Sequence, residues 1–204
     1  MKDKLTLNLF DENFRHIKYS VPARESEHIN WVRDRGEFEG TTVFTDEHMY
    51  RTAPYVRSDK KIGWLLEPRE YKPLAYEQFK YYKNDLDIVF THDKRLLEQF
   101  PGKTQFIPFG GLWIKDENIK VHPKTKDISM IYSFKNFMPG HRLRHTIANL
   151  FKDQIDLYGN GSKHEIREKE EGLIDYRYSV IIENSRTENF FTEKVLDCFV
   201  TGTV

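Results

Sequence analysis

The hydrophobic and polar positions of this chain follow the period of a strand in some segments and that of a helix in others. Leu5–Phe10 alternates between apolar and polar residues, as a half-buried strand does. Tyr71–Lys83 has the amphipathic pattern of a helix, and a charged helix is expected at 94–99. Strands that alternate with helices predict a parallel α/β sheet. Its further strands are expected at 41–45, 62–66, 88–91 and 105–108.

A second series of elements follows a polar stretch between residues 115 and 126. This stretch contains Pro123 and has no sustained period, which is the composition of a linker. The elements expected after it are a strand at 128–132, a helix from His141 or Arg142 to Phe151, a strand at 155–158 and a glycine turn at 159–161. The pattern therefore predicts two α/β domains, residues 1–120 and residues 121–204.

The last part of the chain combines a short apolar run with an amphipathic helix. Val180–Ile182 predicts a strand that is covered on both faces. Thr192 is expected to cap a helix, and Gly202 is expected to end it. The apolar stripe of this helix is expected to consist of Val195, Leu196, Phe199 and Val200.

Polar residues gather where this strand gives way to the helix. Open α/β sheets bind ligands in the crevice at the carboxyl ends of their strands. A helix start offers free N–H groups to an anion, and a lysine beside them adds positive charge. The residues concerned are Glu183, Asn184, Glu193 and Lys194. Taken by themselves, they indicate a phosphate or nucleotide-sugar ligand.

The same segment resembles the donor-site motif of the α-1,3-fucosyltransferases, glycosyltransferase family 10. The likeness consists of a tyrosine at 176 or 178, Glu-Asn-Ser at 183–185, an aromatic residue before Thr-Glu-Lys at 192–194, and an apolar helix ending in Gly-x-Val. The resemblance implies an inverting transfer of fucose from GDP-fucose to a glycan hydroxyl. It also implies two Rossmann-like domains facing a cleft, the GT-B arrangement. Relatives continue beyond Val204, so the second domain is expected to be incomplete.

The resemblance also implies which residues bind the donor. In relatives the glutamate matching Glu193 holds the ribose hydroxyls, and the lysine matching Lys194 holds a phosphate. Phe190 stands where relatives often have tyrosine, so stacking is kept and a hydroxyl contact is lost. The full implied donor site is Arg144, Glu183, Asn184, Ser185, Phe190, Glu193 and Lys194.

An arginine near the start of the helix at 141–151 contacts the donor phosphates in the family. Arg142 and Arg144 both fall there, and residues two apart cannot share one helix face. Arginine suits this task because its planar guanidinium donates two parallel hydrogen bonds to a phosphate. Arg144 is our first choice.

Glu67 is the expected catalytic base. It follows the apolar run Ile62–Leu66 and precedes Pro68, so it lies at the carboxyl end of a predicted strand. A sugar hydroxyl needs a carboxylate to accept its proton during attack. In the family this glutamate belongs to a Glu-Ser-Pro-like motif, whereas this chain has no serine before Pro68. Glu70 is therefore a competing candidate.

Composition restricts the possible partners. Lysine and arginine total 32 and so do aspartate and glutamate, so no net charge attracts nucleic acid. No apolar run approaches 18 residues, which predicts no transmembrane segment and leaves peripheral membrane contact open. Cys198 is the only cysteine, and a reducing, cytoplasmic compartment is expected.

No metal and no cofactor besides the donor substrate is expected. His141 and His145 could form half a metal site, but no third ligand has suitable spacing. The expected partners are a nucleotide-sugar donor and a glycan acceptor. The alternatives that remain open are a transferase using another nucleotide sugar and an inactive nucleotide-sugar-binding fragment.

Overall fold

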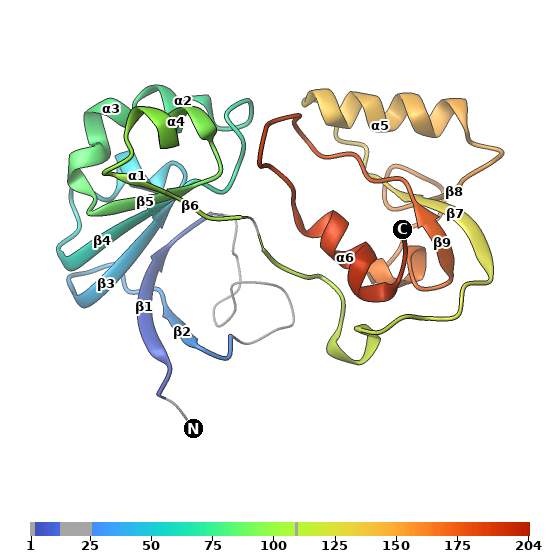
Figure 1. Cartoon of the computed structure of the whole chain (residues 1–204), viewed down its shortest axis with the longest axis horizontal. Helices are drawn as coiled ribbons and strands as arrows, with labels where there is room; N and C mark the ends of the chain where they lie inside the picture. Colours follow the sequence, from blue (N-terminus) through green and yellow to red (C-terminus); the bar gives the residue numbers. More distant parts are fainter. Residues whose placement is uncertain (1–2, 13–25, 109) are drawn as a thin grey trace. The chain divides into compact units, whose positions relative to one another are not determined.

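The computed structural model describes residues 3–12, 26–108 and 110–204. Their contacts divide the chain into two compact units, each of them an α/β unit (Figure 1). The first unit is Met1–Phe109 with Thr187–Phe190, and the second is Gly110–Arg186 with Phe191–Val204. The second unit therefore begins at Gly110, before the polar stretch 115–126 in which a linker is predicted.

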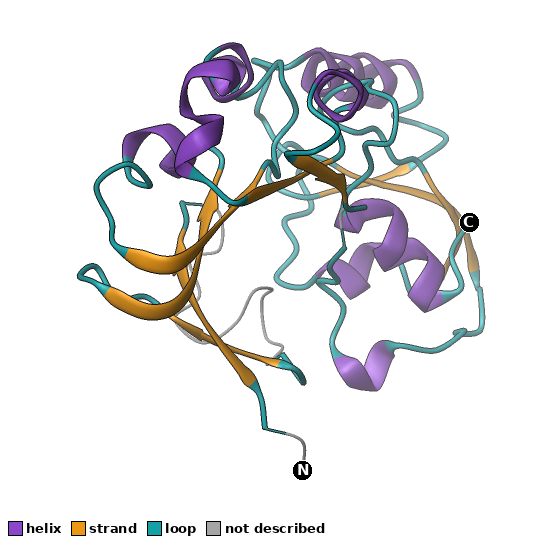
Figure 2. Ribbon diagram, turned by 60° about the vertical axis from the view of Figure 1, so that its left-hand side comes forward, coloured by secondary structure: helices purple, strands orange, loops and turns teal. Residues whose placement is uncertain are grey.

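The first unit is built on a six-stranded sheet in which every pair of neighbouring strands is parallel. The strand order is β2-β1-β3-β4-β5-β6, and the strands fan out with the usual twist (Figure 2). The strands are β1 (Leu5–Phe10), β2 (Ile29–Val32), β3 (Phe38–Thr45), β4 (Ser58–Trp64), β5 (Ile88–Thr91) and β6 (Thr104–Phe106). The predicted parallel α/β sheet is therefore present.

Short helices cover one face of this sheet (Figure 1). They are α1 (His48–Arg51), α2 (Pro73–Glu77), α3 (Phe79–Tyr82), the 3-10 turn η1 (Lys83–Asp85) and α4 (Lys94–Gln99). The helical pattern predicted over 71–83 is confirmed in part, because the segment is helical but is divided into α2, α3 and η1. Phe44 and Val89 of the sheet pack against Tyr76, Phe79 and Leu96 of these helices in one buried core.

Strand β4 ends at Trp64, two residues before the predicted end. Leu65 and Leu66 leave the sheet but stay buried. Asp46, which follows β3, holds this turn because its Oδ1 accepts the backbone N–H groups of Leu66 at 2.9 Å and Glu67 at 3.1 Å. Asp46 has a left-handed backbone with φ 42°, a conformation that Asp and Asn tolerate better than most residues. The buried Asp46 side chain thus fixes the backbone position of Glu67 after β4.

The buried Asp46 carboxyl is expected to make stability depend on pH. Burial raises its pKa from 3.8 to about 7, although the two amide donors lower it. The folded chain therefore binds this proton more tightly than the unfolded chain does. The resulting stabilisation is complete below pH 4 and is lost as the pH rises through 7. Relative to Asp46→Asn, the parent should lose roughly 3–4 kcal/mol of unfolding free energy across that range.

Urea unfolding from pH 4 to pH 8 measures this difference. The side-chain amide introduced by Asp46→Asn would keep an oxygen acceptor for both backbone N–H groups and would not titrate, so the variant curve should be flatter. Asp59→Asn is the matched control, because Asp59 is exposed on β4 of the same sheet. Parallel curves for the parent and Asp46→Asn would contradict the expectation.

The second unit has a three-stranded parallel sheet of order β8-β7-β9. Its strands are β7 (Lys126–Ile131), β8 (Asp156–Tyr158) and β9 (Tyr176–Ser179). The helical elements are α5 (Pro139–Leu150), α6 (Glu193–Thr201) and the 3-10 turns η2 (Asp116–Asn118) and η3 (Lys169–Gly172). Met130 packs with Ala148 of α5, whereas its neighbour Ile131 packs with Cys198 of α6. Successive strand residues therefore face helices on opposite sides of the sheet.

The prediction of a strand at Val180–Ile182 is wrong, since β9 ends at Ser179. The Val180 N–H still donates to the Ser129 carbonyl at 2.8 Å, but the Ile182 carbonyl accepts from the Arg144 side chain instead of a strand. Val180 and Ile182 pack on the α5 side, and Ile181 packs on the α6 side. The apolar run is therefore covered on both sides without being part of the ladder.

Helix α6 begins after Thr192 and ends at Gly202, whose φ is 70°, as predicted. The Thr192 side chain makes no cap hydrogen bond, because its hydroxyl donates to Glu183 instead. Its predicted apolar stripe is wrong in part. Phe199 is 66% exposed, and the buried residues of α6 are Asp197, Cys198 and Thr201. Hydrogen bonds to the Asp197 carboxylate allow this polar residue to occupy the buried face. None of the described helices is long and apolar enough to cross a membrane.

Candidate functional site

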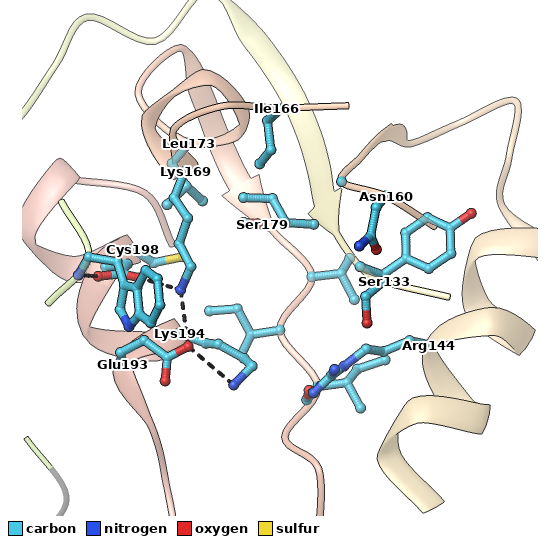
Figure 3. Close-up of a pocket in the computed structure, with 18 of the residues that line it drawn as sticks. Ser133, Arg144, Asn160, Ile166, Lys169, Leu173, Ser179, Glu193, Lys194 and Cys198 are labelled. Atoms are coloured by element: carbon cyan, nitrogen blue, oxygen red, sulfur yellow. Dashed lines mark hydrogen bonds and ion pairs between the residues drawn. The ribbon is translucent and has the colours of Figure 1, made fainter. Parts of the chain in front are cut away.

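A cavity of about 630 Å³ lies in the second unit where its strands end. Its walls include Ser133 after β7 and Asn160 after β8 (Figure 3). The segment Val180–Ile182 after β9 also lines it. The first turn of α6 closes another side with Glu193 and Lys194. This is the crevice in which open α/β sheets bind ligands, and its volume is in the range of small-molecule sites.

Two glycines allow the backbone to come together around this cavity. Gly159 has φ 92°, and a Cβ there would lie 2.4 Å from the Tyr132 carbonyl oxygen. Gly140 opens α5 and donates its N–H to the Asn184 carbonyl at 3.0 Å. A Cβ on Gly140 would lie 1.8 Å from the Glu183 carbonyl oxygen. The start of α5 is therefore packed directly against the Glu-Asn-Ser segment.

Arg144 is a buried cation in the cavity wall. Its Nε donates to the Ile182 carbonyl at 2.8 Å, and its Nη2 donates to Asn184 Oδ1 at 2.8 Å. Among the described residues, no carboxylate lies within ion-pair distance of this guanidinium. Burial lowers its pKa, although Glu183 and Glu193 act in the opposite direction. The wall thus carries a positive charge that an anionic ligand could neutralise.

Arg142 differs from Arg144 in exposure and position. It is exposed and does not line the cavity. Its Nη1 donates to the carbonyls of Asn136 at 3.4 Å and Phe137 at 3.2 Å. Of the two arginines on α5, only Arg144 is placed to contact a ligand in the cavity.

Glu183 supports the start of α6. Its Oε1 accepts the Thr192 N–H at 2.7 Å, and both of its oxygens accept from the Thr192 hydroxyl. Its Oε2 also receives the Lys194 ammonium at 3.4 Å. A carboxylate at the N-terminus of a helix stabilises it through the helix dipole. Glu183 does not line the cavity but positions the residues that do.

Glu193 and Lys194 are adjacent at the cavity wall. The Lys194 ammonium donates to the Thr192 hydroxyl at 2.8 Å and lies 3.4 Å from Glu193 Oε1. Burial would raise the pKa of Glu193, but Lys169 and Lys194 outweigh it and bring the pKa to about 2. The site therefore places an ionised carboxylate beside positively charged groups.

The remaining donor-site residues lie elsewhere. Ser185 is buried and does not line the cavity. Phe190 belongs to the segment that groups with the first unit, where its ring centre lies 4.8 Å from that of His92. Glu67 is a half-buried residue of the first unit. The cavity therefore brings together four of the predicted donor residues, namely Arg144, Asn184, Glu193 and Lys194.

His141 adds no positive charge to this wall. The Met138 N–H donates to His141 Nδ1 at 3.3 Å. Burial and the nearby Arg144 and Lys135 lower the pKa of His141 to about 4, so the ring is neutral at pH 7. In the described ranges, no group of three or more His, Cys, Asp or Glu residues is arranged to hold a metal ion.

The charged and aromatic cavity residues that the prediction missed include Trp113, Lys169 and Asp197. Trp113 lies in the stretch read as the end of the first domain. Asp197 lies in α6, whose buried face was predicted from its apolar residues alone, so a buried carboxylate was not expected there. Lys169 stands in a charged segment without periodicity. The one available signal was the i, i+4 spacing of Glu193 and Asp197, which places both on one side of α6.

Comparisons of this chain with protein-family models, with curated proteins and with solved structures found no match.

Proposed function

We propose that this chain is an inverting glycosyltransferase that moves fucose from GDP-fucose to a glycan hydroxyl. In this proposal it acts in the manner of the family 10 α-1,3-fucosyltransferases, and its two α/β units have a GT-B arrangement. The observation that carries the proposal is the cavity of the second unit. There Arg144 has no carboxylate partner among the described residues, and Glu193 and Lys194 open α6. A diphosphate that also bears hydroxyl groups matches this combination of cations and carboxylate.

The proposed reaction is a single displacement at C1 of the donor fucose. The acceptor oxygen bonds to C1 while the bond from C1 to the diphosphate oxygen breaks on the opposite face, which inverts the configuration. Glu67 takes the acceptor proton, and GDP leaves with the electron pair of the broken bond. Arg144 and Lys194 stabilise the negative charge that grows on the diphosphate, an effect that is strongest in a site with little water.

Two other functions could use the same cavity. Ile131, Leu173, Val180 and Ile181 give part of its lining an apolar character that does not select a particular base, which favours a transferase using another nucleotide sugar. The Leu-Glu-Pro sequence at Glu67 departs from the family motif, which favours an inactive nucleotide-sugar-binding fragment. Both alternatives keep the ligand class and change the sugar or the chemistry.

A thermal-shift comparison of GDP, UDP and CMP tests the ligand. At about one hundred times its dissociation constant, a nucleotide adds about 2.7 kcal/mol, which raises the unfolding midpoint of a chain this size by about 5–10 °C. GDP is expected to give this shift, and inorganic phosphate at the same concentration is the control for bulk anion effects. A shift with UDP or CMP and none with GDP would exclude fucose. Nucleotide release in the presence of a glycan acceptor then separates the transferase from the binding fragment.

A further inference from the structure

Lys169 lies at the cavity and joins two carboxylates of α6. Its ammonium donates to Glu193 Oε1 at 3.0 Å and to Asp197 Oδ2 at 2.8 Å. Figure 3 shows Lys169 reaching from η3 to the side of α6 that carries Glu193. Glu193 and Asp197 are one helical turn apart, and two like charges at that spacing repel each other. Lys169 lies between them and lowers the pKa of both carboxyls, although burial still raises the pKa of Asp197.

The same interaction fixes a further part of the cavity wall. Asp197 Oδ1 accepts the Trp113 backbone N–H at 2.8 Å. The Lys169 ammonium also lies 5.2 Å from the centre of the Trp113 ring, a cation–π distance. The Asp197 side chain is 1% exposed, so its carboxylate is protected from solvent. Lys169 thus connects the Trp113 loop, η3 and the start of α6.

The orientation of Glu193 has consequences for recognition. Lys169 and Lys194 both meet Oε1 of Glu193 and hold the carboxylate from one side. An ionised carboxylate only accepts hydrogen bonds, so it cannot bind a phosphate and selects a donor group of the ligand. In a guanine nucleotide both the two neighbouring ribose hydroxyls and the N–H groups of the base can donate to a carboxylate. The Lys194 ammonium, which would meet the diphosphate, lies only 3.4 Å from Glu193 Oε1, so the ribose beside the diphosphate is the nearer donor. An acidic residue that is fixed in this way recognises the sugar part of the nucleotide by accepting its hydrogen bonds.

We infer that Lys169 is a positioning residue that makes this cavity discriminate a ribonucleotide from its deoxy form, by holding Glu193 in line with the ribose hydroxyls. The inference rests on the proposed function, since it assumes a nucleotide in the cavity. Lys169 touches no reacting atom, and it acts through Glu193 and through the wall around Trp113.

Calorimetric titration with GDP and with 2′,3′-dideoxy-GDP tests the inference. The parent should bind GDP about tenfold to a hundredfold more tightly, the range for hydrogen bonds to a charged group. Lys169→Met should bring the ratio of the two affinities close to one, mainly by weakening GDP binding. Lys169→Arg keeps the positive charge and should keep most of the discrimination. Lys163→Met is the matched control, because Lys163 is exposed and lies outside the cavity.

Removing Lys169 alone leaves Asp197 as a buried, unpaired charge, which could prevent folding. The double variant Lys169→Met/Asp197→Asn avoids this, because the amide oxygen can still accept the Trp113 N–H. It should show the same loss of discrimination. An unchanged affinity ratio, or an equal loss of affinity for both nucleotides, would overturn the inference and leave the proposed function standing. A parent that binds no nucleotide would overturn both.

Discussion

Glu67→Gln is expected to lower glycosyl transfer by about 10²- to 10⁴-fold, the usual contribution of a positioned general base. The amide has the shape of the carboxylate but cannot take the proton of the acceptor hydroxyl. Glu67 lies in the first unit and Arg144, Glu193 and Lys194 in the second, so nucleotide affinity should remain at the parent value.

The backbone around Glu67 is held well enough to position a base. Its N–H donates to Asp46 Oδ1 at 3.1 Å, and its carbonyl accepts the Tyr76 hydroxyl at 2.6 Å. Pro68 is buried and restricts Glu67 to an extended backbone. These contacts involve Asp46 after β3 and Tyr76 of α2, so a substitution of the Glu67 side chain leaves them in place.

Glu70→Gln is the matched control for Glu67. Glu70 is exposed and lies three residues further along the same segment. Transfer rates and nucleotide affinities of both variants should be measured side by side with a glycan acceptor. A parent rate for Glu67→Gln together with a dead Glu70→Gln would move the base to Glu70. A parent that binds GDP and transfers nothing would favour the nucleotide-sugar-binding fragment.

Arg144→Ala is expected to reduce turnover by about 10²- to 10³-fold, the effect of losing one donor that stabilises a developing negative charge. Donor affinity should fall less, because this charge is greatest as the diphosphate departs. The change also removes the donors to the Ile182 carbonyl and to Asn184. Part of the loss could therefore reflect a disturbed wall.

Two further variants separate charge from wall structure. Arg144→Lys keeps the charge and one donor but loses the planar fork, so it should recover only part of the rate. Arg142→Ala should retain the parent rate, because Arg142 is exposed and bonds only to the carbonyls of Asn136 and Phe137. Single-turnover and equilibrium binding measurements distinguish the two effects. A greater loss of rate for Arg142→Ala than for Arg144→Ala would contradict the placement of the phosphate site.

The sequence by itself determined those strands and helix ends that depend on the residues immediately around them. The alternation in Leu5–Phe10 and the apolar run at Ile88–Thr91 correspond to β1 and β5 with the same bounds. Helix α6 begins after Thr192 and ends at Gly202, because a left-handed residue that favours glycine terminates the helix. Arg144, which was chosen over Arg142, lines the cavity, and its contact with donor phosphates stays a prediction. Each of these features depends on period or end chemistry within a few neighbouring residues.

Only the tertiary structure decided which polar groups are buried together. Asp197 occupies the covered face of α6 because Lys169 and the Trp113 N–H, both distant in sequence, satisfy its carboxylate. The Ile182 carbonyl, beyond the end of β9, accepts a hydrogen bond from Arg144 of α5 and not from a neighbouring strand. Asp46 is likewise paired with the Leu66 amide, which is far along the chain. A local pattern scores these residues as polar or apolar, whereas their burial depends on long-range partners that compensate the cost of desolvation.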